Sequence, residues 1–276
     1  LVSPGSYAIE FRKLASKLFQ VDPDWIVPAN GSDESLTVIT RSFCDADETI
    51  AYPYPSYVLY ESLAQIQGCK VVRLKLNSDW QWNPKEAEQL RKTARVFYVP
   101  NPNSPTGNVW SAEQLCELLP NRGVLVLDEA YGDFCQVPHR GELLRDDRFD
   151  RRMIVTRTFS KSYSLAGIRF GFAIAHPEVI SGMQKVKDSY NCDTVAIAAA
   201  TAAMADQDWM QQNRAKILAT RERLAAALPA FGFRVCPSEA NFLWTTHATG
   251  RHREIYEQLK QQKILIRYMR FPDALP

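Results

Sequence analysis

Residues 156–171 read TRTFSKSYSLAGIRFG and lie between two apolar runs, 153–156 and 170–175. These runs predict two strands joined by a turn that holds several hydroxyl groups and one lysine, Lys161. A lysine held in a low-dielectric pocket has a lowered pKa, which makes its amine a nucleophile toward carbonyl groups. The alternative is a solvated turn whose lysine projects outward.

The side chains around Lys161 are suited to an anion. Thr158 and Ser160 offer hydroxyl donors, and Arg169 offers a bidentate cation, which together are the groups that bind a phosphate ester. A lysine that forms an imine beside a phosphate site is the combination that pyridoxal phosphate requires. The stretch therefore predicts a pyridoxal-phosphate site.

Strand-like runs alternate with helical patterns from residue 26 to residue 175. The run 124–127 is continuously apolar, as in a central parallel strand that is covered on both faces. It ends at Asp128, and ligands of open α/β sheets bind at the carboxyl ends of the strands. The pattern predicts an α/β fold with a mostly parallel sheet.

Three further segments carry candidate site residues. The loop 100–107 holds two asparagines between prolines, which makes it rigid, and the loop 53–57 offers Tyr54 and Tyr57 for stacking on a flat ring. A Gly-Ser-Asp-Glu turn at 31–34 opens a helical pattern, so its backbone amides are suited to an anion. An N-cap without a ligand explains the same turn equally well.

Composition excludes several classes of function. The 276 residues include 46% hydrophobic and 23% charged residues with a net charge of +2, so neither nucleic acid nor an anionic membrane is expected as a partner. No apolar run of about eighteen residues and no signal-peptide pattern occurs, so we expect a cytoplasmic protein. The cysteines and histidines are unclustered, so we expect no metal site.

The character of the chain changes after residue 177. Three helical patterns are followed by strand-like runs at 233–235, 241–244 and 264–268, an order that is typical of a separate α+β domain. We therefore expect a large cofactor-binding domain over residues 20–190. We expect residues 1–19 and 205–276 to form a smaller domain.

The candidate motifs occur in a fixed order that resembles the fold-type-I aminotransferases, which use pyridoxal phosphate. They are Asn-Pro-Asn-x-Pro-Thr-Gly at 101–107, Asp-x-x-Tyr at 128–131, and Ser-Lys at 160–161 followed eight residues later by Arg169. Residues 21–23, 55–57, 165–169 and 238–242 make the chain most similar to the histidinol-phosphate aminotransferases. The resemblance implies an aspartate-aminotransferase-like fold and a homodimer.

It also implies a reaction. Histidinol phosphate would pass its amino group to 2-oxoglutarate, giving imidazole acetol phosphate and L-glutamate in histidine biosynthesis. An aromatic amino-acid aminotransferase and a threonine-phosphate decarboxylase remain the close alternatives within this fold. A catalytically inactive ligand-binding relative is the alternative of another class, but it would need neither Lys161 nor Asp128.

The resemblance further implies a role for each candidate residue. Lys161 would bind the cofactor covalently and then move the proton during transamination, and Asp128 would pair with the pyridine nitrogen. Asn103 and Tyr131 would hydrogen-bond the ring's O3′, and the Tyr57 ring would stack on the cofactor. The phosphate would lie among Ser32, Asp33, Thr158, Ser160 and Arg169.

Two features of the family are not found. The chain opens with Val2-Ser3-Pro4-Gly5 instead of a Tyr-Pro motif whose tyrosine reaches the partner subunit, and it reaches Pro276 before the arginine that binds the substrate α-carboxylate. We therefore expect residues 1–276 to contain a complete cofactor pocket and an incomplete substrate pocket.

Overall fold

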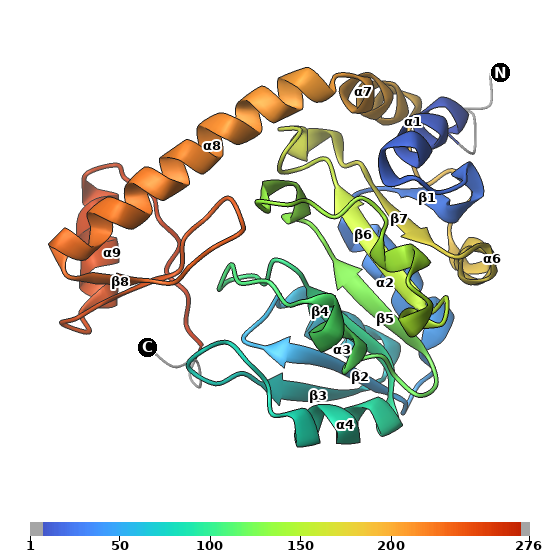
Figure 1. The fold of residues 1–276 in the computed structure, drawn as a ribbon, viewed down its shortest axis with the longest axis horizontal. Coiled ribbons are helices and arrows are strands. Elements are labelled where there is room, and N and C mark those ends of the chain that lie inside the picture. The colour runs from blue at the N-terminus through green and yellow to red at the C-terminus, as the bar shows by residue number, and fades with distance from the viewer. Residues whose placement is uncertain (1–7, 272–276) are drawn as a thin grey trace.

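The computed structural model describes residues 8–271, and its centre is a seven-stranded sheet (Figure 1). The strand order is β1-β7-β6-β5-β4-β2-β3, and β7 pairs antiparallel with both of its neighbours while all other pairs are parallel. This confirms the predicted α/β fold with a mostly parallel sheet. The strands are β1 (Ile26–Ala29), β2 (Thr49–Tyr54), β3 (Lys70–Lys75), β4 (Ala94–Pro100), β5 (Val124–Asp128), β6 (Met153–Thr158) and β7 (Gly171–Ala175).

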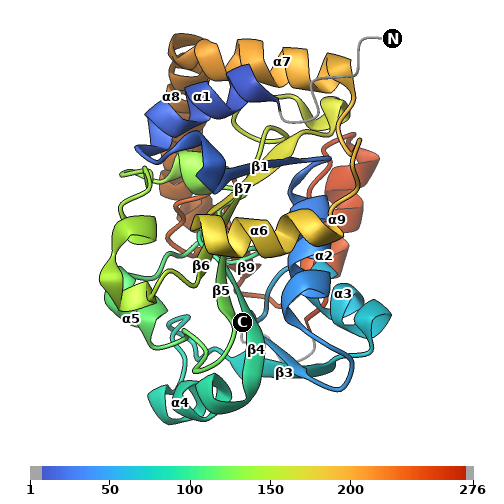
Figure 2. The same cartoon turned by 90° about the vertical axis from the view of Figure 1, so that its right-hand side faces the viewer.

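Helices cover both faces of this sheet, as Figure 2 shows from the side. One face packs against α2 (Ser32–Phe43), α3 (Leu59–Gln67) and α6 (Pro177–Val186). The other packs against α1 (Ile9–Phe19), α4 (Pro84–Thr93), α5 (Ala112–Cys116) and α7 (Thr194–Ala205).

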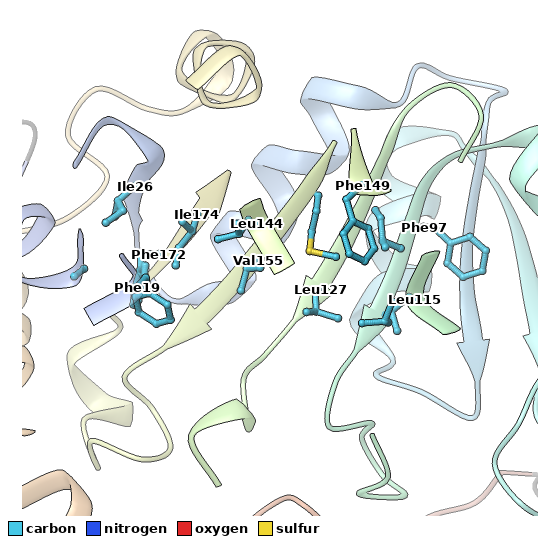
Figure 3. Packing of buried hydrophobic residues seen from close by; sticks show 14 of the residues in the cluster. Phe19, Ile26, Phe97, Leu115, Leu127, Leu144, Phe149, Val155, Phe172 and Ile174 are labelled. Carbon is cyan, nitrogen blue, oxygen red and sulfur yellow. The ribbon is translucent and has the colours of Figure 1, made fainter. Parts of the chain in front are cut away.

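The central strand β5 explains why its sequence is continuously apolar. Leu125 and Leu127 belong to one core cluster, whereas Val124 and Val126 belong to the other. Successive side chains of a strand point to opposite faces, so a strand covered on both sides has no position for a polar residue until it ends. Figure 3 shows Leu127 between Val155 and Leu115, in the same core cluster.

One detail of β2 differs from expectation, because Pro53 lies inside the strand instead of ending it. Proline lacks the N–H that a strand donates to its neighbour. The pairing of β2 with β4 extends only to Ala51, while the pairing with β3 continues to Tyr54. Pro53 therefore lies beyond the residues of β2 that pair with β4, where that side of the strand needs no N–H donor.

The last part of the chain forms a second, smaller unit. The long helix α8 (Gln207–Ala227) leads from α7 to a two-stranded sheet of β8 (Phe233–Val235) and β9 (Thr245–His247), beside α9 (His252–Gln261) (Figure 1). The predicted strands at 241–244 and 264–268 are wrong, since neither segment pairs within the described residues. Residues 241–244 form a loop that the Ser238 hydroxyl fixes by donating to the Phe242 carbonyl at 2.7 Å.

The predicted division into a domain over 20–190 and a domain from 1–19 and 205–276 stays a prediction. Helix α1 packs Phe11 edge-to-face against Phe159, Phe170 and Phe172, so it lies on the large sheet. Residues 1–7, including the predicted departure at Val2-Ser3-Pro4-Gly5, and residues 272–276 lie outside the described residues. Between residues 8 and 271, no helix combines the length and apolar character that a membrane span requires.

Candidate active site

Asp128 lies at the carboxyl end of β5 and is 5% exposed. Its Oδ2 accepts a hydrogen bond from the Tyr60 hydroxyl at 2.8 Å, and its Oδ1 accepts from Thr156 Oγ1 and the Ala130 amide, each at 3.2 Å. Burial raises the pKa of Asp128, and the three donors act against that rise. A buried carboxylate thus lies at the carboxyl end of a parallel strand, which is where open α/β sheets bind their ligands.

Three tyrosines surround this carboxylate from one side. The Tyr60 ring stacks on Tyr98 with 4.8 Å between centroids and meets Tyr57 edge-on at 5.7 Å. The Tyr57 hydroxyl donates to Asp33 Oδ1 at 3.3 Å, and burial, followed by the nearby Asp33 and Asp128, raises the pKa of Tyr57 to about 12. Tyr57 therefore remains a neutral, half-buried ring between Asp128 and the start of α2.

The start of α2 and the turn after β6 meet at a group of anion-binding donors. Gly31 has φ 82°, and a Cβ there would lie 2.6 Å from Nη2 of Arg169. Arg169 Nη1 in turn donates to Ser160 Oγ at 3.3 Å, and the Ser160 amide donates to Thr158 Oγ1 at 3.2 Å. A helix N-terminus, a guanidinium and hydroxyls thus converge, as binding of a phosphate requires.

The carboxylate of Asp33 occupies part of this group, with Oδ2 lying 3.5 Å from Nη2 of Arg169. Ser32 begins α2 and is buried, and a Cβ on Gly171 would lie 2.6 Å from the Ser32 amide nitrogen. The close approach of β7 to the first turn of α2 therefore depends on glycine at residue 171.

Lys161 is exposed, so its predicted burial is wrong for this chain. The turn is anchored by its neighbours instead, because Phe159 and Ser162 are buried and Ser162 Oγ donates to Asp133 Oδ2 at 2.6 Å. The Lys161 amine lies 5.4 Å from the ring centroid of Tyr131. The Tyr131 ring packs edge-on against Phe242 of the smaller unit, with 4.9 Å between centroids.

Asn103, in the loop after β4, is fully buried. Its Nδ2 donates to the Pro55 carbonyl at 3.2 Å and to Thr106 Oγ1 at 2.6 Å, which ties this loop to the one that carries Tyr57. Its Oδ1 is buried without a hydrogen-bond partner among the described residues. Such an orphaned polar atom indicates that a further group belongs beside Asn103.

A continuous set of contacts thus brings the predicted residues together. Asn103 contacts the Tyr57 loop, Tyr57 contacts Asp33, and Asp33 contacts Arg169 and so reaches Ser160 and Thr158. Tyr60 connects Tyr57 to Asp128, while Lys161, next to Ser160 in the chain, faces Tyr131. The arrangement offers an amine, a buried carboxylate, an aromatic ring and an anion site within one region.

A buried ion cluster adjoins these residues, and no motif or spacing predicted it. Arg157, 3% exposed, pairs with Glu129 through Nη1 at 2.7 Å and with Asp133 through Nη2. Burial acts to raise the pKa of Glu129 and of Asp133, but neighbouring groups, His139 and Arg157 for Glu129 and Arg157 for Asp133, outweigh it, so both pKa values are lowered. The cluster joins the residue after Asp128 to Ser162, the residue after Lys161.

Tyr60 and Thr156 were also missed as site residues. Tyr60 stands three positions after Tyr57, which lies just before α3, and this spacing of about one helical turn brings the two rings together. Thr156 is the register partner of Asp128 in the parallel pair β5–β6. Thr156 can be recognised only if β5 and β6 are known to be adjacent, and Tyr60 only if it is known which tyrosine faces Asp128.

Comparisons with known proteins agree with this geometry. The family model for aminotransferase class I and II matches residues 2–276. The histidinol-phosphate aminotransferases of Rhodopirellula baltica and Geotalea daltonii are 46% and 42% identical to this chain, and each alignment covers 98% of it and 74% or 76% of the relative. The crystal structure of histidinol-phosphate aminotransferase from Sinorhizobium meliloti in complex with pyridoxal-5′-phosphate is similar with a TM-score of 0.87 and 26% identity, covering 98% of this chain and 75% of that one.

Proposed function

The chain belongs to the class I and II aminotransferase family, and from that premise we propose that it transfers the amino group of histidinol phosphate to 2-oxoglutarate. The protein is an aminotransferase that uses pyridoxal phosphate. The observation that carries the proposal is the set of contacts that joins Asp128 and Tyr57 to the Arg169 anion site beside Lys161.

The residues present fit the cofactor. Asn103 keeps its buried amide oxygen without a partner among residues 8–271, and a Cβ at Gly31 would displace the Arg169 guanidinium from the start of α2. Ser32, Asp33, Thr158, Ser160 and Arg169 would hold the phosphate, and Tyr57 would cover the ring. Asn103 and Tyr131 would bind the ring's O3′, and Asp128 would accept a hydrogen bond from the ring nitrogen.

When bound, pyridoxal phosphate supplies an electron sink for the negative charge that forms at the reacting carbon of the substrate. Lys161 holds the cofactor through its amine, and once released it takes the proton from that carbon and delivers it as a general acid. Asp128 would keep a proton on the ring nitrogen, because three hydrogen-bond donors stabilise its carboxylate and it has no other cation among the hydrogen-bond and salt-bridge partners of the described residues. Tyr131 and Asn103 orient the ring toward Lys161.

Transfer of the amino group to a second substrate would follow by the same groups in reverse. 2-Oxoglutarate is proposed as that acceptor, in keeping with the resemblance to the histidinol-phosphate aminotransferases. The aromatic aminotransferase and the threonine-phosphate decarboxylase share the cofactor site, so the amino donor decides among the three.

A donor panel tests this assignment. The purified holoenzyme is mixed with histidinol phosphate, phenylalanine or threonine phosphate, and loss of the cofactor's visible band in a single half-reaction is followed. We expect histidinol phosphate to react with the highest kcat/KM, and Lys161→Ala to react with none of the donors. A preference for phenylalanine would indicate an aromatic amino-acid aminotransferase instead. Release of carbon dioxide from threonine phosphate would indicate a decarboxylase.

The proposal extends to a cytoplasmic homodimer that serves histidine biosynthesis. Exposed apolar side chains on α1, α7 and α8, namely Ile9, Val195 and Trp209, support a contact between subunits, because α7 contacts both α1 and α8 (Figure 1). Light scattering during gel filtration is expected to give twice the mass of 31.4 kDa for this chain.

A further inference from the structure

The two oxygens of the Asp128 carboxylate are held by unequal donors. Oδ1 accepts from Thr156 Oγ1 and the Ala130 amide, both at 3.2 Å, whereas Oδ2 accepts from the Tyr60 hydroxyl alone at 2.8 Å. Charge-assisted hydrogen bonds are the shorter and stronger ones. Tyr60 therefore gives Asp128 its closest contact among the described residues.

Tyr60 has little freedom to turn its hydroxyl elsewhere. The residue is completely buried, its ring lies parallel to Tyr98 at an interplanar angle of 1°, and its edge meets Tyr57 at 89°. Tyr98 is fixed in turn, because its hydroxyl lies 2.7 Å from Thr40 Oγ1 and donates to the Leu36 carbonyl at 3.1 Å. The stack thus fixes one O–H in line with one carboxylate oxygen.

The position of this donor has a consequence for the cofactor. A buried carboxylate and a ring nitrogen share one proton, and a low dielectric favours the neutral arrangement in which the carboxylate holds it. Burial raises the pKa of Asp128 and acts in that direction. A donor on the carboxylate stabilises only the charged arrangement, in which the proton lies on the ring nitrogen.

We propose that Tyr60 is a positioning residue that keeps Asp128 ionised, so that the proton of the pair stays on the cofactor's ring nitrogen. The inference rests on the proposed function, since it takes Asp128 as the partner of that nitrogen. Tyr60 acts only through Asp128. Its hydroxyl makes no other hydrogen bond among residues 8–271.

The test uses holoenzyme loaded with pyridoxal phosphate that carries ¹⁵N in the ring. The ¹⁵N chemical shift reports directly whether the ring nitrogen is protonated, and it is followed from pH 6 to pH 10 in the wild type, Tyr60→Phe and Tyr98→Phe. Tyr98→Phe is the matched control, because it also removes one buried hydroxyl from the same stack without touching Asp128.

We expect Tyr60→Phe to lower the pH at which the ring nitrogen loses its proton by about one to two units, with a similar ten- to hundredfold loss in kcat. Tyr98→Phe should leave both unchanged. An unshifted titration in Tyr60→Phe, or an equal shift in Tyr98→Phe, would overturn the inference.

Two further samples separate the possible failures. If Asp128→Asn leaves the ¹⁵N titration as in the wild type, Asp128 is not the partner of the ring and the proposed site assignment fails with the inference. If Asp128→Asn changes it and Tyr60→Phe does not, the inference alone fails. Should Tyr60→Phe not fold, 3-fluorotyrosine at residue 60 gives a stronger donor, and the proposal then requires the titration to move to higher pH.

Discussion

Replacement of Arg157 by methionine tests how the buried ion cluster supports the site. The methionine keeps most of the apolar stem of the side chain, but it removes the guanidinium, whose carbon lies 5.2 Å from the Phe19 ring centroid. Within the described chain, this guanidinium is the only cation that pairs with both Glu129 and Asp133. Removing one partner of a buried ion pair costs about 3–5 kcal/mol, because the opposite charge stays buried without compensation. That corresponds to a fall in Tm of roughly 10 °C for a chain of this size.

The loss should depend on pH with a definite sign. In the wild type the pKa values of Glu129 and Asp133 are lowered, so their contribution to stability is present at neutral pH and is lost as pH falls through the folded-state values. Without Arg157, burial is opposed only by the remaining partners, His139 for Glu129 and Ser162 and Arg140 for Asp133, so the same carboxylates are protonated more easily. The difference in stability between wild type and variant is therefore largest near pH 7.5 and narrows toward pH 4.5.

Urea unfolding of both proteins at the two pH values measures this difference. Arg148→Met is the matched control, because Arg148 also pairs with two carboxylates, Asp146 and Glu113, but on the surface, where its side chain is 49% exposed. Surface ion pairs contribute little to stability. The electrostatic argument would be refuted if the two variants lost the same free energy of unfolding. It would also be refuted if the difference in that free energy between wild type and Arg157→Met grew as the pH is lowered.

Three further predictions concern the site itself. Gly31→Ala should weaken the binding of pyridoxal phosphate about tenfold or more, because the added Cβ displaces Arg169. Gly250 has a similar φ of 69°, and a Cβ added there meets no atom of the described residues within 4 Å apart from its chain neighbours, so Gly250→Ala should leave the Kd measured by fluorescence unchanged. Asp128→Asn should reduce kcat, and because burial raises the pKa of Asp128, its charge weakens the cofactor-free fold as pH rises through that value. The Asn variant should therefore resist urea better than the wild type at pH 8 but not at pH 4. The same difference in urea resistance at both pH values would contradict this reasoning. Lys161→Ala should still bind pyridoxal phosphate in equilibrium dialysis through the Arg169 site yet give no turnover, so a variant that retains turnover would exclude Lys161 as the base.

The large sheet could be predicted because each strand carries its own signal. Val124–Asp128 is apolar on both faces and ends in a carboxylate, so the residues alone determine a buried strand and the edge where a ligand binds. The runs at 241–244 and 264–268 also contain residues that favour strands, but the structure assigns neither to a strand. Strand formation requires a partner, and partners depend on tertiary placement that propensity does not report.

Site residues that lie next to the end of a strand could be predicted from the sequence. Site residues whose contacts depend on how helices and strands pack were missed. Asp128 and Arg169 follow from motif and spacing. The contact of Tyr60 with Asp128, by contrast, joins residues 68 positions apart, and it exists only because α3 lies against the same face as Tyr98. The exposure of Lys161 has the same origin, since Ser162 rather than Lys161 takes the buried position beside Asp133.

Reduction of the holoenzyme with borohydride, followed by peptide mapping, tests the central claim most directly. Borohydride fixes the cofactor to whichever lysine holds it, and the labelled peptide identifies that residue. The site described above predicts a single label at Lys161, which lies beside Ser160 and faces Tyr131. A label on any other lysine, or no label from a protein that visibly contains the cofactor, would contradict it.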